Sequence, residues 1–175
     1  MELFEAISKR HSYRGGFKAQ AIPREDLTRI VQAGIQAPSG CNAQTTSFVI
    51  VDEPDKIAQI AGILERQAVK EAQAIIVCVI DHRPVYQNQS FGAEDCAAAV
   101  ENMLLAVTAL GYATVWLDGV LRAEQRAERI AAILGIPAPL QVRIILPLGI
   151  PTTPGEQREK KPFAERAWFN RYGRP

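Results

Sequence analysis

The chain reads Lys9-Arg10-His11-Ser12-Tyr13-Arg14 near its start, and this basic cluster is the point from which its fold can be worked out. Residues 9–18 hold four Lys or Arg and no acid. Arg10, Ser12 and Arg14 alternate, so in an extended segment their side chains point the same way. Two guanidinium groups and a hydroxyl suit a phosphate or another delocalised anion. A solvated basic turn would have the same composition.

A second stretch supports a functional interpretation of the basic cluster. It reads Ala37-Pro38-Ser39-Gly40-Cys41-Asn42-Ala43-Gln44. Apolar residues recur at helical spacing between residues 25 and 37, and Pro23 and Pro38 bracket them. Residues 47–51 then form an apolar run that predicts a strand. The second stretch therefore leads from a helix into a strand, although Pro-Ser-Gly is also a common turn.

The rest of the chain alternates between apolar runs and helical patterns. Helices are expected at 54–72, 93–110 and 122–134, and strands at 74–80, 114–117 and 140–148. The sequence contains neither Gly-x-Gly-x-x-Gly nor Gly-x4-Gly-Lys, so neither a classical dinucleotide-binding fold nor a P-loop fold is supported.

Composition excludes several classes of protein. The net charge is +1, from 20 basic and 19 acidic residues, which argues against a dedicated nucleic-acid binder. No apolar run reaches membrane-spanning length, and the N-terminus lacks the apolar core of a signal peptide. Three cysteines without CxxC spacing and two histidines favour a reduced cytoplasmic protein without a metal site. We expect a single domain over residues 1–175.

Two features suggest a partner subunit. The helix expected at 93–110 is apolar on nearly every face, as in a helix that is buried on all sides. Residues 150–175 turn polar and proline-rich, and then end with Trp168, Phe169 and Tyr172. Exposed aromatics on a terminal segment usually dock somewhere. We therefore expect residues 150–175 to be an arm that packs on the partner subunit of a homodimer.

Further landmarks follow in a fixed order. They are Asp95–Gly111, Val115-Trp116-Leu117-Asp118-Gly119, Leu134-Gly135-Ile136-Pro137, Leu148-Gly149-Ile150-Pro151 and Asn170-Arg171-Tyr172-Gly173. Together with the two opening stretches, these motifs resemble the nitroreductase family, whose members are homodimeric FMN enzymes. The resemblance covers nearly the whole chain. It implies an α+β fold with a central, mostly antiparallel sheet flanked by helices, and a C-terminal arm exchanged across the dimer.

The resemblance also implies roles for single residues. Arg10 and Ser12 would hold the phosphate and ribityl end of FMN. His11 between them would be a backbone-level contact to the cofactor or a surface residue rather than an acid/base group. Arg14 would reach the pyrimidine edge of the isoalloxazine ring, where a cation stabilises negative charge on the reduced flavin. Basic residues before the C-terminal proline would hold the phosphate from the arm. These are Arg158 and Lys160, with Lys161 as the competing register.

The second stretch would serve the flavin of the other subunit. Pro38, Ser39 and Asn42 would lie against that flavin, with Gln44 nearby. The sequence departs from the family pattern immediately afterwards, because the usual Pro-Trp is replaced by Thr45-Thr46. This replacement predicts a less rigid path into the strand.

Asp118 and Gly119 would lie beside flavin N5, where backbone N–H groups of the family point. Gly119 lets the backbone approach closely. Asp118 stands where a glycine is common, and its carboxylate could orient substrate or point to solvent.

The implied reaction needs no catalytic side chain, because the flavin carries the chemistry. Hydride would pass from NAD(P)H through flavin N5 to a nitroaromatic, a quinone or a similar small acceptor in a ping-pong mechanism. Three other readings remain open: a same-fold dehydrogenase, dehalogenase or flavin-fragmenting enzyme; a non-catalytic flavin-binding dimer; and a basic interaction protein without flavin. The sequence does not distinguish NADH from NADPH, and it does not name the acceptor.

Overall fold

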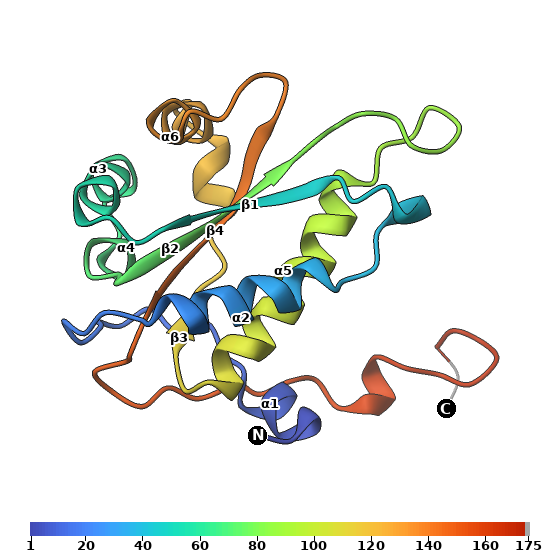
Figure 1. The fold of residues 1–175 in the computed structure, drawn as a ribbon. Coiled ribbons are helices and arrows are strands. Elements are labelled where there is room, and N and C mark those ends of the chain that lie inside the picture. Colours follow the sequence, from blue (N-terminus) through green and yellow to red (C-terminus); the bar gives the residue numbers. More distant parts are fainter. Residues whose placement is uncertain (174–175) are drawn as a thin grey trace.

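The protein is built around a four-stranded antiparallel sheet, seen in a computed structural model that describes residues 1–173 (Figure 1). The strand order is β1-β2-β4-β3. The strands are β1 (Thr46–Val51), β2 (Ala74–Ile80), β3 (Ala113–Thr114) and β4 (Gln141–Gly149). Every neighbouring pair runs antiparallel. The expected α+β fold, with a mostly antiparallel sheet between helices, is confirmed.

Helices cover both faces of the sheet (Figure 1). One core lies between the sheet and helices α2 (Arg24–Ile35) and α5 (Gly92–Ala109). The other lies beneath α3 (Pro54–Leu64) and α6 (Arg126–Leu134). Successive side chains of a strand point to opposite faces, so β2 alternates between the two cores. This explains why all seven residues of β2 are buried and read as one continuous apolar run.

The expected helix at 54–72 is in fact two helices. Helix α3 ends at Leu64, and the short α4 (Gln67–Lys70) follows. The break occurs because Glu65 takes the left-handed conformation with φ of 50° and Arg66 is extended. Two other expectations need correction as well. The strand at 114–117 is reduced to β3 plus an isolated bridge from Leu117 to Ile145, and α6 begins four residues later than expected, at Arg126.

The N-terminal segment and the C-terminal arm lie side by side. The first helix, α1 (Leu3–Lys9), packs on α5. After it, the N–H of Tyr13 donates to the carbonyl oxygen of Thr114 at 2.8 Å, which places residues 10–14 beside β3. The N–H of Lys18 donates to the carbonyl oxygen of Ile150 at 2.9 Å. The arm thus leaves β4 along the same segment that carries the basic cluster.

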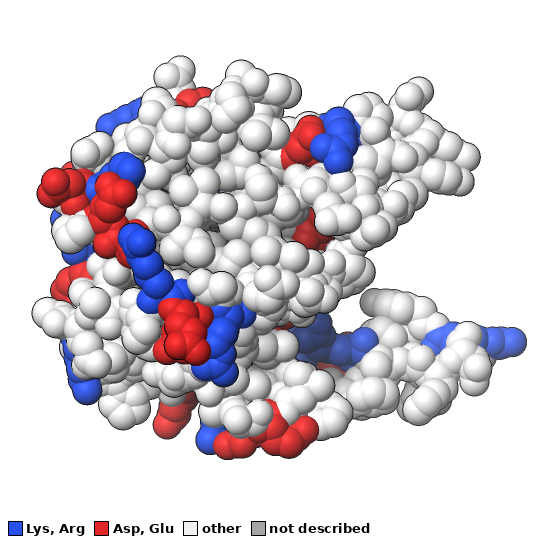
Figure 2. Space-filling view, viewed as in Figure 1, with Lys and Arg blue, Asp and Glu red and all other residues white. Residues whose placement is uncertain are grey.

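The arm then extends away from the rest of the chain (Figure 1). It contains the short η3 (Phe163–Glu165), while residues 169–171 form bends and residues 172–173 form a turn. The side chains of Phe169 and Tyr172 are 82% and 88% exposed. Figure 2 shows charged side chains gathered over the start of α2 and a largely uncharged surface over its later part and over α5. Exposed aromatic side chains on a terminal segment usually dock somewhere, so a partner for the arm stays a prediction.

Candidate functional site

The two basic segments of the chain meet at one cavity of about 350 Å³. Its lining residues are Arg10, His11, Ser12, Arg14, Glu156, Gln157, Arg158 and Lys160. Six of these are residues that the sequence predicts as cofactor ligands. The fold therefore brings the N-terminal cluster and the arm together from opposite ends of the chain.

The two lysines of the arm are placed differently. Lys160 lines the cavity. The ammonium of Lys161 instead lies 3.8 Å from a carboxylate oxygen of Glu165, four residues further along the chain. Of the two registers that the sequence left open, the structure turns Lys160 toward the basic cluster.

Arg14 connects this cavity to a second one of about 490 Å³. The second cavity is lined by Arg14, Glu65–Ala68 and Val115–Val120. It includes Asp118 and Gly119, the residues expected beside the flavin ring. A Cβ atom at Gly119 would meet no atom within 4 Å, so the space in front of this backbone is open. Arg14 stands at the junction of a cationic cavity and a wider one lined partly by apolar side chains.

Asp118 is neither free toward substrate nor turned to solvent. Its two carboxylate oxygens accept hydrogen bonds from Arg122 at 2.8 and 2.7 Å, and a nitrogen of Arg143 lies 3.3 Å away. The hydrogen bonds from Arg122, helped by the charge of Arg143, lower the pKa of the Asp118 carboxyl against the opposing effect of burial. The carboxylate is thus held in a structural ion-pair cluster at the edge of the second cavity.

The loop with Pro38, Ser39, Asn42 and Gln44 lies elsewhere, at the first turn of α5. Pro38, Ser39 and Gln44 line a small cavity of about 60 Å³, and Asn42 ends the short η1 (Gly40–Asn42). The fold of one subunit does not bring this loop together with Arg14. A contact between the loop and the flavin of a second subunit stays a prediction.

Thr45 has a role that the sequence did not reveal. Its side chain is buried, and its hydroxyl donates to Asp95 Oδ2 at 2.6 Å. The other oxygen of Asp95 accepts from the N–H of Gly40 at 2.8 Å. At this position the sequence pattern predicts only a less rigid path, but the hydroxyl of Thr45 adds a contact that a proline could not make.

The sequence also gave no sign of several residues around Arg14. Glu65, Arg66 and Gln67 line the second cavity because the chain breaks between α3 and α4 at that point. No motif marks these three residues. Only the conformational break, which depends on Glu65 in the left-handed region, turns them toward Arg14.

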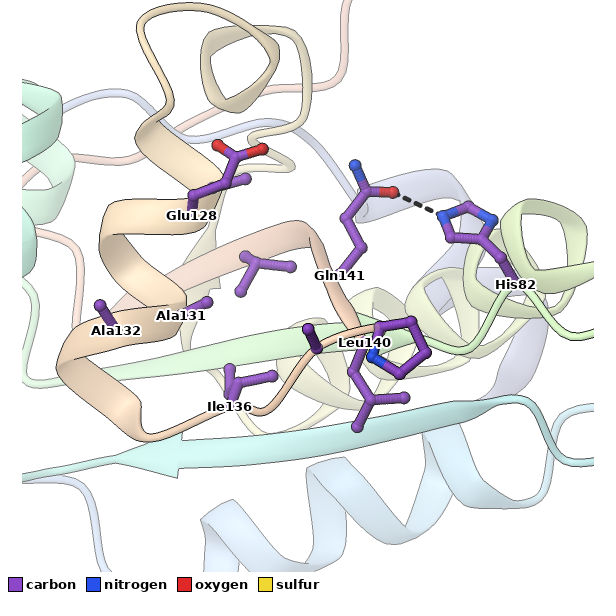
Figure 3. A pocket seen from close by; sticks show the side chains of 11 residues that line it. His82, Glu128, Ala131, Ala132, Ile136, Leu140 and Gln141 are labelled. Carbon is purple, nitrogen blue, oxygen red and sulfur yellow. Dashed lines mark hydrogen bonds between the residues drawn. The ribbon is translucent and has the colours of Figure 1, made fainter.

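Another cavity of about 490 Å³ lies between α6 and the start of β4 (Figure 3). It is lined mostly by apolar side chains. Its polar groups include Glu128 and a pair in which a ring nitrogen of His82 lies 2.6 Å from the side-chain oxygen of Gln141. None of the residues that the sequence predicts as cofactor ligands lines this cavity.

The residues around Arg14 fit FMN by their chemistry. Four cationic side chains (Arg10, Arg14, Arg158 and Lys160) and the Ser12 hydroxyl line the smaller cavity, and a phosphate prefers such donors. Val115, Trp116 and Leu117 give the larger cavity apolar lining for a planar ring. Among residues 1–173, no cluster of three His, Cys, Asp or Glu side chains is placed to hold a metal ion. No helix in the same range is long and apolar enough to cross a membrane.

The chain is similar to a known protein family along most of its length. The family model described as "Nitroreductase family" matches residues 7–78 and 64–150. A protein of Archaeoglobus fulgidus, named provisionally as an NADH dehydrogenase/NAD(P)H nitroreductase, is 32% identical over 165 residues, which are 94% of this chain and 90% of that protein. An iodotyrosine deiodinase of Thermotoga neapolitana is 25% identical over 178 residues, with 87% of this chain and 90% of that protein covered.

The likeness extends to solved structures. The NADPH:FMN oxidoreductase of Vibrio harveyi, solved in complex with NAD⁺, superimposes with a TM-score of 0.83 at 26% identity and covers 99% of this chain and 79% of its own. The expectation of a flavin-dependent oxidoreductase is confirmed at the level of the family. From the family model, the Archaeoglobus relative and the shared fold, it follows that this chain belongs to the nitroreductase family.

Proposed function

We propose that the protein is a homodimeric NAD(P)H oxidoreductase that binds one FMN at each of two sites between the subunits. The observation that carries this proposal is the position of Arg14, which lines both the cationic cavity and the wider one. A cofactor with a phosphate at one end and a planar ring at the other would fill both cavities past this residue.

The two cavities would bind different parts of the cofactor. Arg10, Ser12, Arg158 and Lys160 would bind the phosphate by charge-assisted hydrogen bonds. Arg14 would place its positive charge beside the ring. When bound, FMN supplies the two-electron chemistry by which hydride passes from NAD(P)H to a small acceptor.

The chain's own side chains would orient and bind rather than transfer protons. The carboxylate of Asp118 is already paired with Arg122 and Arg143, so it is not available as a general base. His11 lies at the phosphate end, with its Nδ1 2.9 Å from the carbonyl oxygen of Lys9. We therefore propose that NAD(P)H and the acceptor use the same open cavity in turn, and that protons come from solvent.

The partner subunit would complete the site. Pro38, Ser39, Asn42 and Gln44 lie away from Arg14 within one chain, as they must if they serve the second flavin. The exposed aromatics of the arm and of α1 would be buried in the same assembly. Phe4 on α1 is 75% exposed and Phe163 on the arm is 67% exposed.

The visible spectrum of the purified protein tests the cofactor. We expect flavin bands, release of FMN on denaturation as identified by mass spectrometry, and tighter binding of FMN than of FAD. A colourless protein that does not bind added FMN would overturn the proposal. Anaerobic oxidation of NADH and NADPH with a nitroarene then separates an enzyme from a flavin-storage protein, because only the enzyme consumes the nicotinamide.

A second candidate function is reductive dehalogenation, and the Thermotoga neapolitana relative favours it. The segment between β2 and α5, residues 81–91, is only eleven residues long, which leaves little room for a large lid over the substrate. An open site suits a broad range of acceptors better than one specific substrate. Iodide release from iodotyrosine that is faster than nitroarene reduction, measured in one anaerobic assay, would favour the second function.

A further inference from the structure

A single carboxylate holds both ends of the loop that precedes β1. Asp95 lies in the first turn of α5 and is 6% exposed. Its Oδ1 accepts from the N–H of Gly40 at 2.8 Å, and its Oδ2 accepts from the hydroxyl of Thr45 at 2.6 Å. Both partners belong to the chain segment that leads into the sheet. Asp95 therefore spans the loop at residues 39–45 from one end to the other.

The loop needs such support because its backbone is strained. Cys41, Asn42 and Gln44 have φ values of 52°, 54° and 50°. Residues other than glycine seldom adopt this left-handed region, and they stay there only where surrounding contacts fix them. Inside the loop, the N–H of Gln44 donates to the hydroxyl oxygen of Ser39 at 3.1 Å.

Arg83 and Phe91 also contact the loop at residues 39–45. One guanidinium nitrogen of Arg83 donates to the carbonyl oxygen of Ala43 at 2.6 Å, and another pairs with Asp81. The ring of Phe91 covers Gly40 so closely that a Cβ atom there would collide with it. The loop is thus held at Gly40, Ala43 and Thr45 by residues that are not themselves predicted ligands.

We propose that Asp95 is a positioning residue for the cofactor site of the opposite subunit. Through Gly40 and Thr45 it fixes the backbone that carries Pro38, Ser39 and Asn42. Thr45 has the hydroxyl that this arrangement requires, which gives the departure from the family's usual proline a physical reason. The inference rests on the proposed function, because it assumes that the loop faces a flavin.

The test compares substitutions at Thr45 with a matched control elsewhere. Thr45→Val removes the hydroxyl at nearly constant volume, and Thr45→Ser keeps it. Tyr112→Phe is the control, since the Tyr112 hydroxyl also donates to a carboxylate, Asp26, at 2.7 Å, but far from the loop in the sequence. For each full-length variant we would measure the Kd for FMN, the spectrum of bound flavin, Tm, and hydrogen exchange of a peptide spanning residues 39–45.

We expect Thr45→Val to weaken FMN binding about tenfold, to shift the bound-flavin spectrum and to speed exchange in residues 39–45. Thr45→Ser should restore all three. Tyr112→Phe should lower Tm while leaving these three readouts as in the unmodified protein. If Thr45→Val changes Tm alone, as Tyr112→Phe does, the positioning role is wrong.

Arg83→Met keeps the test decisive if Thr45→Val does not fold. The Arg83 side chain is 52% exposed, so its removal leaves the core intact. The substitution frees the carbonyl of Ala43, so we expect faster hydrogen exchange in residues 39–45 and weaker FMN binding, as for Thr45→Val. Unchanged values would count against the proposal.

The proposed function and the role of Asp95 are contradicted by different results. An unmodified protein that binds no FMN overturns the proposed function, whereas one that binds FMN with unchanged spectra in all loop variants overturns only the role of Asp95.

Discussion

The side-chain amide of Gln157 donates to the carbonyl oxygen of Arg10 at 2.8 Å, across 147 positions of the chain. The same amide nitrogen lies 3.1 Å from the carbonyl oxygen of Ile7. The contact joins the end of α1 to the arm through an amide and two backbone carbonyls. It therefore holds the two basic segments together without using the charges of Arg10, Arg158 or Lys160.

Gln157→Leu should loosen this junction. Each lost hydrogen bond is worth about 0.5–1.5 kcal/mol net, so FMN binding should weaken by roughly twofold to tenfold for each bond that the cofactor site depends on. Titration of the flavin-free protein with FMN would measure the change. The exposed Gln20 provides the control Gln20→Leu, which should leave Kd unchanged. Equal affinities in both variants would show that the junction does not support the cofactor site.

The double variant Arg158→Ala with Lys160→Ala should weaken FMN binding while leaving the redox potential of bound flavin nearly unchanged. Both side chains line the cationic cavity, away from the wider one. Charge-assisted hydrogen bonds contribute about 1.5–3 kcal/mol each, so a loss of tenfold or more in affinity is expected. Lys161→Ala is the matched control, because Lys161 faces Glu165. A control that weakens binding as much as the double variant would place the phosphate on the other register.

Arg14→Ala should change the redox potential of bound flavin more than the affinity for FMN. If the guanidinium faces the ring, its loss removes about 1.5–3 kcal/mol of stabilisation from the reduced flavin and lowers the two-electron potential by about 30–65 mV. Reduction by NAD(P)H should slow accordingly. Arg14→Lys keeps the charge and should recover part of the potential. Potentiometry on Arg14→Ala and on the double variant of the arm decides the assignment, which is wrong if only the arm variant shifts the potential.

The lowered pKa of the Asp118 carboxyl predicts that the fold loses stability at acid pH. Its pKa is lowered from an ordinary value of 3.8, mainly by hydrogen bonds from Arg122. A carboxyl whose pKa is lower in the folded state stabilises the fold above the unfolded value and loses this effect as pH falls through the folded value. The Tm difference between the unmodified protein and Asp118→Asn should therefore be constant at neutral pH and should shrink below about pH 3.8. A difference that does not change with pH would mean that the ion pairs contribute nothing measurable.

The expected homodimer can be tested by measuring its mass and by substituting aromatic residues of the arm. Light scattering of the folded, flavin-loaded protein at micromolar concentration should report twice 19.2 kDa. Phe169→Ser with Tyr172→Ser should shift the equilibrium toward monomer, because these exposed rings would be buried against a partner. Tyr86→Ser removes an exposed aromatic outside the arm and should not. A monomeric mass for the unmodified protein would contradict the assembly.

The sequence predicted the parts of this fold that depend on local pattern. Continuous apolar runs and helical spacing located the main strands and helices, and the order of the motifs identified the family. The break between α3 and α4 could not be predicted, because Glu65 adopts a left-handed conformation that neither glycine nor asparagine signals. The same break brings Arg66 and Gln67 to the cavity of Arg14, so these lining residues were missed with it.

Contacts between residues far apart in the chain could not be predicted from the sequence either. Arg122 lies one helical turn after Asp118 and could have been paired with it from spacing alone. Arg143 approaches the same carboxylate from β4, and Thr45 reaches Asp95 across 50 positions. Both contacts depend on how the sheet and α5 pack, which residue types do not reveal. The individual ligand assignments remain predictions.

The strand order has a consequence for how the chain folds as it is synthesised. β4 lies between β2 and β3, yet it is the last strand to leave the ribosome. Until residues 141–149 emerge, β2 presents an unpaired backbone edge with apolar side chains on both faces. Such an edge is a template for pairing with other chains. Nascent chains stalled before Gln141 should therefore aggregate or bind chaperones, while chains that include Gly149 can close the sheet.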